Sequence, residues 1–240
     1  MEIKVHLAKD RGSADYGWLK AKYSFSFANY YNSKLVNFGA LRVLNDDIIQ
    51  GGMGFGEHPH NNMEIITIPL KGSLKHQDSM SNEWITLQTG EVQVMSAGKG
   101  ILHSERNNAY DEILNIFQIW IIPNKQEVEP RYYQKVFDAT KRENKLQILV
   151  SSSNNPVEDS LTIHQDAKIS RIDLTNGISF LYTLTTEKHG VFIMVISGRI
   201  AVENEILQKK DAITISEKSK VELKAKRISQ LLIIEVPMSH

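Results

Sequence analysis

Two histidine motifs in the first half of the sequence have the residue types and spacing of a metal site. The first is "GEHPHNNMEI" at 56–65, where His58 and His60 flank Pro59 and Glu64 follows. In an extended chain, residues i and i+2 point to the same face, so both imidazoles would project from one side of a strand. Glu64 keeps this parity and shares the face if the strand is unbroken. Because Pro59 cannot donate to a β-ladder, we expect it at a strand start or an irregularity.

The second motif is "SAGKGILHSERN" at 96–107, where His103 and Glu105 are again two residues apart. Gly98 and Gly100 precede them and predict a tight turn. Two strands that each present such a pair can bring four ligands to one interior point. Three imidazoles and one carboxylate suit Fe, Mn, Co, Ni, Cu or Zn and leave positions open for water or substrate.

A single His-X-His also occurs in solvated turns, so neither pair alone establishes a metal site. Together they are a stronger indication, because three of only eight histidines fall in two pairs beside glycine-containing turns. The remaining histidines are expected not to be ligands: His6 and His240 near the termini, His164 and His189 isolated in the second half, and His76 after a glycine turn, on the surface or behind the site.

The composition narrows the classes of function. The 240 residues contain no cysteine, which excludes disulfides, thiolate nucleophiles, iron–sulfur clusters and Cys-type zinc sites. Lys plus Arg equals Asp plus Glu, 28 each, so no direct nucleic-acid or membrane-surface partner is expected. The N-terminus has no apolar signal region and no segment has the length of a membrane span, which predicts a soluble cytoplasmic protein. A protein partner would leave no readable trace.

The segments that must position the motifs are short runs rich in Ile and Val, bounded by Gly, Pro, Asn or Asp. They are "GALRVLNDDII" (39–49), "EIITIPLKG" (64–72), "EVQVMSAG" (91–98), "LNIFQIWIIP" (114–123), "KISRIDL" (168–174), "ISFLYTLTT" (178–186), "GVFIMVISGRIAVENEIL" (190–207) and "SQLLIIEVP" (229–237). No long segment has apolar residues at helical spacing, so helices should be few and short. The sequence therefore predicts an all-β sandwich or barrel.

The two halves of the sequence echo each other across a polar stretch at 124–145 and a Ser- and Asn-rich loop at 151–160. "IITIPLKGSLKH" around Gly72 resembles "FIMVISGRIAVE" around Gly198, and "LQTGEVQVM" resembles "LQKKDAITI". Such internal similarity predicts a duplicated β-barrel. The expected domains are 1–137 and 138–240.

The spacing from Gly52 through His58, His60 and Glu64 to Gly72 resembles the first cupin motif. "GEVQVMSAGKGILHSE" resembles the second cupin motif, with Ser96 where a proline is usual. More specifically, the HPH element, "KHQDS" at 75–79 and "GKGILHSE" resemble the pirin family, as do "GWLKAKYSFSFANYY" and "FQIWIIP". One departure is "NNME", where many relatives have Gly-Phe before the glutamate.

The resemblance implies a bicupin of two jelly-roll β-barrel domains. Carried over by position, the metal ligands are His58, His60, His103 and Glu105, whereas most other cupins would use Glu64. The metal domain is then 1–137. Aligning Gly198 with Gly72 places Leu184, Thr186 and Gly190 where the first half has His58, His60 and Glu64. Domain 138–240 is therefore expected to be a degenerate cupin without metal.

Bacterial pirin-like proteins are associated with quercetin 2,3-dioxygenase activity, so the resemblance implies an enzyme that opens a flavonol ring with dioxygen and releases carbon monoxide. One divalent metal is expected, Fe(II) first, with Cu, Ni, Co, Mn or Zn also compatible. Glu105 would be the catalytic residue, taking the proton of the flavonol's 3-hydroxyl as general base. The alternative is a non-enzymatic, metal-dependent redox sensor or protein-binding regulatory module.

Overall fold

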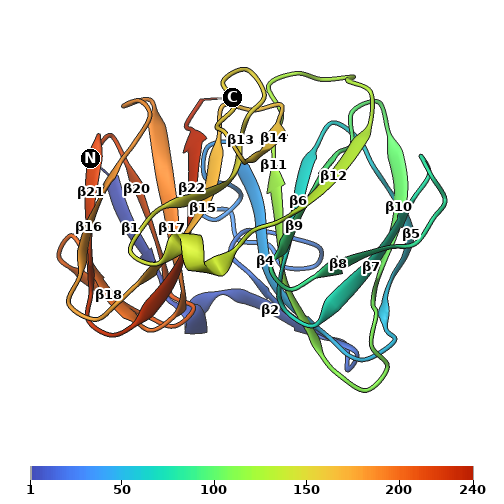
Figure 1. Cartoon of the computed structure of the whole chain (residues 1–240), viewed down its shortest axis with the longest axis horizontal. Coiled ribbons are helices and arrows are strands. Elements are labelled where there is room, and N and C mark those ends of the chain that lie inside the picture. Colours follow the sequence, from blue (N-terminus) through green and yellow to red (C-terminus); the bar gives the residue numbers. More distant parts are fainter. Residues whose placement is uncertain (1, 240) are drawn as a thin grey trace.

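The chain forms two β-barrels that lie side by side (Figure 1). The computed structural model describes residues 2–239, so His240 lies outside the described residues. Two 3₁₀ helices, η1 (Ala8–Asp10) and η2 (Ala139–Arg142), are the helical elements of this part of the chain. The predicted all-β bicupin fold with few, short helices is confirmed. Within residues 2–239 no helix is long and apolar enough to cross a membrane.

The first barrel pairs a large sheet with a small one. The large sheet has the order β12-β9-β6-β11-β4-β3-β2 and the small sheet the order β5-β10-β7-β8. The strands are β2 (Gly12–Asp15), β3 (Leu19–Tyr23), β4 (Leu41–Ile49), β5 (Gly54–His60), β6 (Glu64–Lys71), β7 (Ser73–Asp78), β8 (Ile85–Gln88), β9 (Glu91–Ser96), β10 (Ile101–Asn107), β11 (Leu114–Ile121) and β12 (Arg131–Val136).

The second barrel repeats this plan, with a large sheet in the order β1-β20-β17-β22-β15-β13-β14 and a small sheet in the order β16-β21-β18-β19. The strands are β1 (Glu2–His6), β13 (Gln147–Ser152), β14 (Leu161–Ile163), β15 (Lys168–Leu174), β16 (Ser179–Thr183), β17 (His189–Ser197), β18 (Arg199–Val202), β19 (Glu205–Gln208), β20 (Ala212–Ser216), β21 (Lys220–Ala225) and β22 (Ser229–Pro237).

The matching strand orders confirm the predicted duplication. Gly72 joins β6 to β7 and Gly198 joins β17 to β18, at equivalent places in the two barrels. Both glycines have positive φ values, +79° and +94°, which L-residues with side chains rarely adopt. The turn that the two sequences share is therefore a backbone requirement of the common fold.

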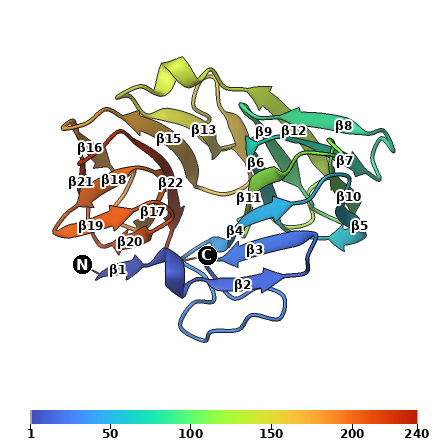
Figure 2. The same ribbon diagram turned by 90° about the horizontal axis from the view of Figure 1, so that it is seen from below.

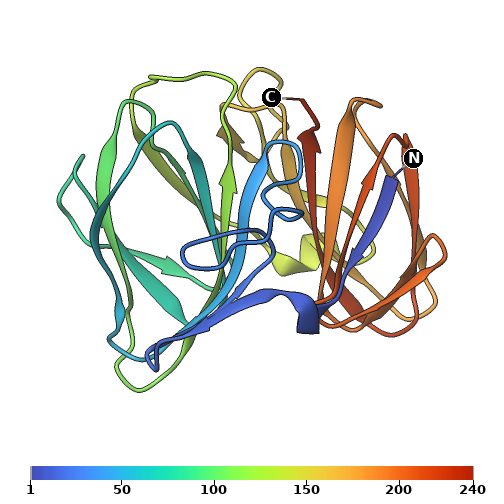
Figure 3. The same cartoon turned by 180° about the vertical axis from the view of Figure 1, so that it is seen from behind.

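The chain start crosses between the barrels. β1 pairs with β20 in the second barrel, and the chain then passes through η1 to β2 in the first (Figure 3). The polar stretch at 124–145 contains the half-exposed edge strand β12 as well as η2. The domain boundary at residue 137 stays a prediction, with the first strand of the chain contributed to the second barrel.

The large sheets of the two barrels pack against each other, and the small sheets lie on the outer sides (Figure 2). Central strands are therefore buried on both faces, which explains their nearly continuous apolar sequences. In β11, Phe117 and Ile119 enter the core between the barrels. The alternate residues Gln118 and Trp120 line a cavity inside the first barrel. This alternation selects which side chains reach the site.

Candidate metal centre

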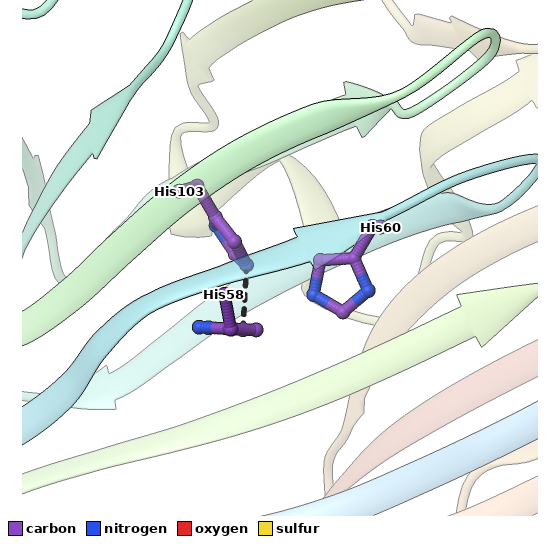
Figure 4. A group of neighbouring side chains, drawn as sticks. All are labelled: His58, His60 and His103. Atoms are coloured by element: carbon purple, nitrogen blue, oxygen red, sulfur yellow. Dashed lines mark hydrogen bonds between the residues drawn. The ribbon is translucent and has the colours of Figure 1, made fainter.

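Strands β5 and β10 bring the two sequence motifs together, because they pair antiparallel with His58 directly opposite His103 and His60 opposite Ile101. The three imidazoles face one another (Figure 4). Their ring centroids are 4.3 Å apart for His58 and His103, 4.9 Å for His58 and His60, and 4.8 Å for His60 and His103. One ring nitrogen from each histidine lies within 4.8 Å of the others.

The spacing of the ring nitrogens fits a shared cation. The Nε2 atoms of His58 and His103 are 2.9 Å apart. Metal–nitrogen bonds of about 2.0–2.1 Å at right angles place two ligand atoms about 2.9 Å apart. His58 Nδ1 donates to the carbonyl of Gly56 at 2.8 Å, which leaves Nε2 with a free lone pair in the neutral ring.

A β-bulge in β5 sets the direction of the histidine side chains. The register between β10 and β5 shifts after His103, so that Glu105 pairs with Phe55. The extra residue on β5 lies at Gly56 or Glu57, immediately before the histidines, where bulges commonly redirect side chains. A Cβ at Gly54 would lie 2.1 Å from the carbonyl oxygen of Glu105. Only glycine therefore lets β5 approach β10 this closely.

Glu105 follows His103 by two residues on β10 and, like His103, is 2% exposed. Its Oε2 accepts a hydrogen bond from Gln118 Nε2 at 2.9 Å. Its Oε1 is buried and has no hydrogen-bond partner in the part of the chain that the structure describes. Burial raises the pKa of Glu105 to about 7, although hydrogen bonds from Gln118 and Thr67 act in the opposite direction. An unpartnered buried carboxylate oxygen next to the imidazole of His103 fits a metal ligand.

The four predicted ligands do not form one equidistant group. His58, His60 and His103 form one cluster, and Glu105 clusters with His103 and His76 within the same 4.8 Å limit. His103 belongs to both clusters. The structure thus brings the three histidines together and places Glu105 next to His103, and the assignment of all four as ligands stays a prediction.

Glu64 faces another direction. The strand breaks at 61–63, where Asn62 has a φ of +44°, so the parity argument from His60 does not extend to Glu64. Glu64 Oε2 instead accepts a hydrogen bond from Ser96 Oγ at 2.6 Å, and Ser96 Oγ accepts one from Arg131 Nε at 2.9 Å. Burial raises the pKa of Glu64 to about 7. Its carboxylate is therefore paired and lies outside both His clusters.

Electrostatics keep two of the histidines neutral. Burial, followed by the nearby His58, lowers the pKa of His60 to about 4. Burial and the neighbouring imidazoles lower the pKa of His103 to about 2. Neutral imidazole is the form that binds metals, so protons do not compete for the imidazoles of His60 and His103 at neutral pH.

His76 lies closer to the site than the sequence indicated. It is fully buried, so its expected place on the surface was wrong, and its place behind the site stays a prediction. Its Nε2 lies 3.0 Å from Asp78 Oδ2, and its ring is 5.3 Å from that of His103. β7 pairs with β10 so that His76 is opposite Glu105. The "KHQDS" sequence thus forms the strand that pairs with β10, which carries His103 and Glu105.

A cavity of about 450 Å³ opens in front of the site. Aromatic rings form much of its wall, and His58, His60 and Glu105 lie at one end; the aromatic residues are Trp18, Phe27, Phe55 and Trp120. The Trp120 ring lies 4.9 Å from that of His60. His60 and Trp120 also line a second pocket of about 660 Å³, so the histidine end of the cavity lies beside this pocket. The size and apolar walls suit a planar aromatic ligand.

The second barrel has apolar side chains at the equivalent interior positions. In the first barrel, the pairing of β7 with β10 places His76 opposite Glu105. In the second barrel, the equivalent strands β18 and β21 place Val202 opposite Leu223, two residues along from the pair of Ile200 and Ala225. Val202 and Leu223 are fully buried in an apolar cluster. Among residues 2–239, both clusters of potential metal ligands lie in the first barrel.

His189, for which no role was expected, is a buried structural histidine of the second barrel. Its Nδ1 lies 2.8 Å from Glu235 Oε1, and Tyr182 donates to Glu235 Oε2 at 2.6 Å. Sequence reasoning also missed Asn45, Asp47 and Gln118 as cavity residues. Their signal was available, because polar residues interrupt "RVLNDDII" and "NIFQIWI", two otherwise apolar strands.

Comparison with known proteins places this chain in a family. The family model described as Pirin matches residues 4–121, and the model described as Quercetinase C-terminal cupin domain matches residues 149–236. Quercetin 2,3-dioxygenase of Escherichia coli K12 is 38% identical over 235 residues, which cover 98% of this chain and 99% of that protein. A putative quercetin 2,3-dioxygenase of Zymomonas mobilis is 39% identical over 227 residues, 94% of each chain.

Solved structures of bacterial relatives match this chain over nearly its full length, in agreement with the sequence comparisons. The crystal structure of YhhW from Escherichia coli matches with a TM-score of 0.93 and 37% identity, covering 100% of this chain and 99% of that one. The structure of bacterial pirin YhhW in complex with nickel(II) matches with a TM-score of 0.91 and 36% identity, covering 98% and 99%.

Proposed function

The chain belongs to the pirin family, and from that membership and the geometry of the site we propose that it is a metal-dependent dioxygenase acting on flavonols. The observation that carries the proposal is the cluster of three imidazoles beside an aromatic cavity, with the buried, unpartnered carboxylate oxygen of Glu105 next to one of them. The relatives named quercetin 2,3-dioxygenase support this choice of substrate, and the nickel complex of a relative supports a divalent metal.

We assign His58, His60, His103 and Glu105 as the ligands of one metal ion, with Fe(II) as the expected native ion. A bound divalent metal would supply Lewis acidity for the flavonol's 3-hydroxyl and one-electron chemistry for dioxygen. The overall reaction incorporates both oxygen atoms of dioxygen, opens the central ring and releases carbon monoxide.

The side chains of the protein orient the substrate and move one proton. Trp18 and Phe55, whose ring centroids are 5.3 Å apart, form part of the apolar wall against which the flavonol rings lie. Glu105 takes the proton from the 3-hydroxyl through Oε1, while the Gln118 hydrogen bond holds Oε2 in place. The buried position of Glu105 excludes bulk water from this proton transfer.

The test measures oxygen consumption, loss of quercetin's long-wavelength absorbance and carbon monoxide release, with protein loaded separately with iron(II) and nickel(II). Turnover with at least one metal, lost in His58→Ala, is expected. Fully metallated protein that gives no turnover with any flavonol would refute the enzyme and favour a non-catalytic metal-binding role. Glu105→Gln should lower the rate per bound metal by about 10²-fold or more, the scale of general-base catalysis.

A further inference from the structure

Two polar residues of β4 face the cavity without partners. Asn45 and Asp47 are 2% and 5% exposed and both line the aromatic cavity. Oδ1 of each is buried and unpaired, and neither side chain forms a hydrogen bond with any described residue. Buried polar groups are almost always hydrogen-bonded, because an unpaired one loses its interaction with water and gains nothing.

Asp46, the residue between them on β4, shows that a polar side chain on this strand can have partners. Asp46, which points to the opposite face of β4, accepts a hydrogen bond from Asn115 Nδ2 at 2.8 Å and forms an ion pair with Lys210 at 2.8 Å. The strand therefore pairs its outward carboxylate fully and leaves the inward groups open. The open groups coincide with the cavity.

The cavity presents its polar groups on two sides. His58, His60 and Glu105 form the metal side on the small sheet, and Asn45 and Asp47 lie on the large sheet. β4 pairs with β11 so that Asn45 is opposite Gln118, which in turn contacts Glu105. A rigid aromatic ligand bound at the metal would extend along the aromatic wall toward the large sheet.

We propose that Asn45 and Asp47 form a second anchor that accepts hydrogen bonds from hydroxyl groups on the part of the ligand that does not reach the metal. This inference rests on the proposed function and narrows its substrate class to planar aromatic compounds with a metal-chelating hydroxyl–carbonyl pair and further hydroxyls beyond it. A flavonol without the further hydroxyls would leave both oxygens unpaired.

The protonation state of Asp47 is compatible with this role. Burial, followed by the charges of Asp46 and Glu105, raises the pKa of Asp47 to about 8, although Arg11 acts in the opposite direction. At neutral pH the group is then mainly a neutral carboxylic acid, which both accepts and donates hydrogen bonds. A polyhydroxylated ring offers both complements, and burying the neutral acid costs less than burying a carboxylate.

The experiment compares two ligands on nickel-loaded protein without oxygen. Quercetin has the chelating pair and further hydroxyls, whereas 3-hydroxyflavone has the chelating pair alone. Dissociation constants come from absorbance titrations. The wild type should bind quercetin at least about tenfold more tightly, because a site built to hydrogen-bond a hydroxyl discriminates against the analogue that lacks it. Asp47→Leu and Asn45→Leu should each reduce quercetin affinity by about tenfold and leave that of 3-hydroxyflavone unchanged.

A second readout separates a binding role from a structural one. Asp47→Leu removes an unpaired buried carboxyl, so the melting temperature of the ligand-free protein should rise while quercetin affinity falls. Ser170→Ala is the matched control, because Ser170 Oγ in the second barrel is also buried and unpaired among residues 2–239. It should leave both affinities unchanged.

An unchanged ratio of the two affinities in both β4 variants would overturn the second anchor, as would a lower melting temperature in Asp47→Leu. Failure of the wild type to bind either flavonol would do the same. The dioxygenase proposal is tested separately. A wild type that binds quercetin selectively but consumes no oxygen would support the second anchor and refute the dioxygenase reaction. Turnover by the wild type, together with unchanged selectivity of the β4 variants for quercetin over 3-hydroxyflavone, would support the reaction and refute the second anchor.

Discussion

We expect the two buried glutamates of the first barrel, Glu64 and Glu105, to respond alike to pH in the metal-free protein and differently to metal. Burial gives Glu105 a folded-state pKa of about 7, against an ordinary value of 4.5. The folded state holds this proton more tightly than the unfolded state does. The resulting contribution to the free energy of unfolding is fully present below pH 4.5, where Glu105 is protonated in both the folded and the unfolded state, and is lost as pH rises through 7. Linkage gives a loss of about 2.5 kcal/mol between pH 5 and pH 9, and Glu105→Gln should not show it.

The comparison uses the change in unfolding free energy between pH 5 and pH 9. A loss of stability that the substitution causes equally at both pH values therefore cancels. For a chain of this size, the loss corresponds to a difference of about 5–10 °C in melting temperature between the two pH values. Glu64 has a similar raised pKa, about 7, also caused first by burial. Glu64→Gln should therefore flatten the pH dependence of the metal-free protein to a similar extent, which makes it a matched control.

Nickel(II) distinguishes the two variants. Loss of an outer-shell partner typically costs 10–100-fold in metal affinity, and loss of a direct ligand should reach at least the top of this range. At a nickel concentration that saturates the wild type, Glu105→Gln should therefore gain about 2 kcal/mol less stability than the wild type. Glu64→Gln should gain as much as the wild type. The assay is thermal unfolding with and without nickel at pH 5 and pH 9.

Two results would refute this reasoning. Superimposed pH profiles of the metal-free wild type and Glu105→Gln would mean that Glu105 has no raised pKa. Equal nickel stabilisation of the wild type and Glu105→Gln, with a reduced gain in Glu64→Gln, would mean that this chain uses the glutamate typical of most cupins.

Three further predictions concern the ligands and the second barrel. Metal analysis should find about one equivalent per chain in the wild type and in the control His164→Ala, and almost none in the double variant His58→Ala with His60→Ala; unchanged content there would place the metal elsewhere. Burial alone would raise the pKa of Glu235, but hydrogen bonds lower it to about 2. The wild type should thus lose about 2 kcal/mol more than Glu235→Gln between pH 5 and pH 3 in urea unfolding, and parallel curves would contradict this. Leu223→Glu, which places a carboxylate at the position equivalent to Glu105, should cost about 3 kcal/mol or more and create no metal binding; a mild effect would show that the second barrel tolerates a buried charge.

The sequence was sufficient for the fold and for the proximity of the histidines. Strand patterns, turn glycines and the internal repeat each depend on local backbone requirements, which a single sequence records. The i, i+2 spacing correctly predicted that His58 and His60 share a face, and Gly98 and Gly100 have the positive φ values of the expected turn, +45° and +137°. These features depend on neighbours in the chain.

Features that depend on strand register or on a break in a strand were not predictable in this way. The same-face argument for Glu64 assumed a continuous strand, and the left-handed conformation of Asn62 ends that continuity. His76 looks like a surface residue after a turn, and its burial follows only from the pairing of β7 with β10. The position of Glu105 opposite His76 likewise follows from a register between strands that are distant in sequence.

The two barrels show how one architecture separates packing from chemistry. Interior positions of the second barrel, such as Val202 and Leu223, are apolar and complete its core. The equivalent residues of the first barrel, His76 and Glu105, are polar, and each has a buried atom without a partner among the described residues. Unpaired groups of this kind destabilise a fold, so a barrel that keeps them needs support from elsewhere. The extensive apolar contact between the large sheets supplies it, because the second barrel covers the outer face of β4 and β11. The inner faces of these strands carry the polar cavity residues Asn45, Asp47 and Gln118, across the barrel from the small sheet that holds His76 and Glu105. The barrel without the ligand cluster therefore acts on the site by stabilising the sheet that forms its inner wall.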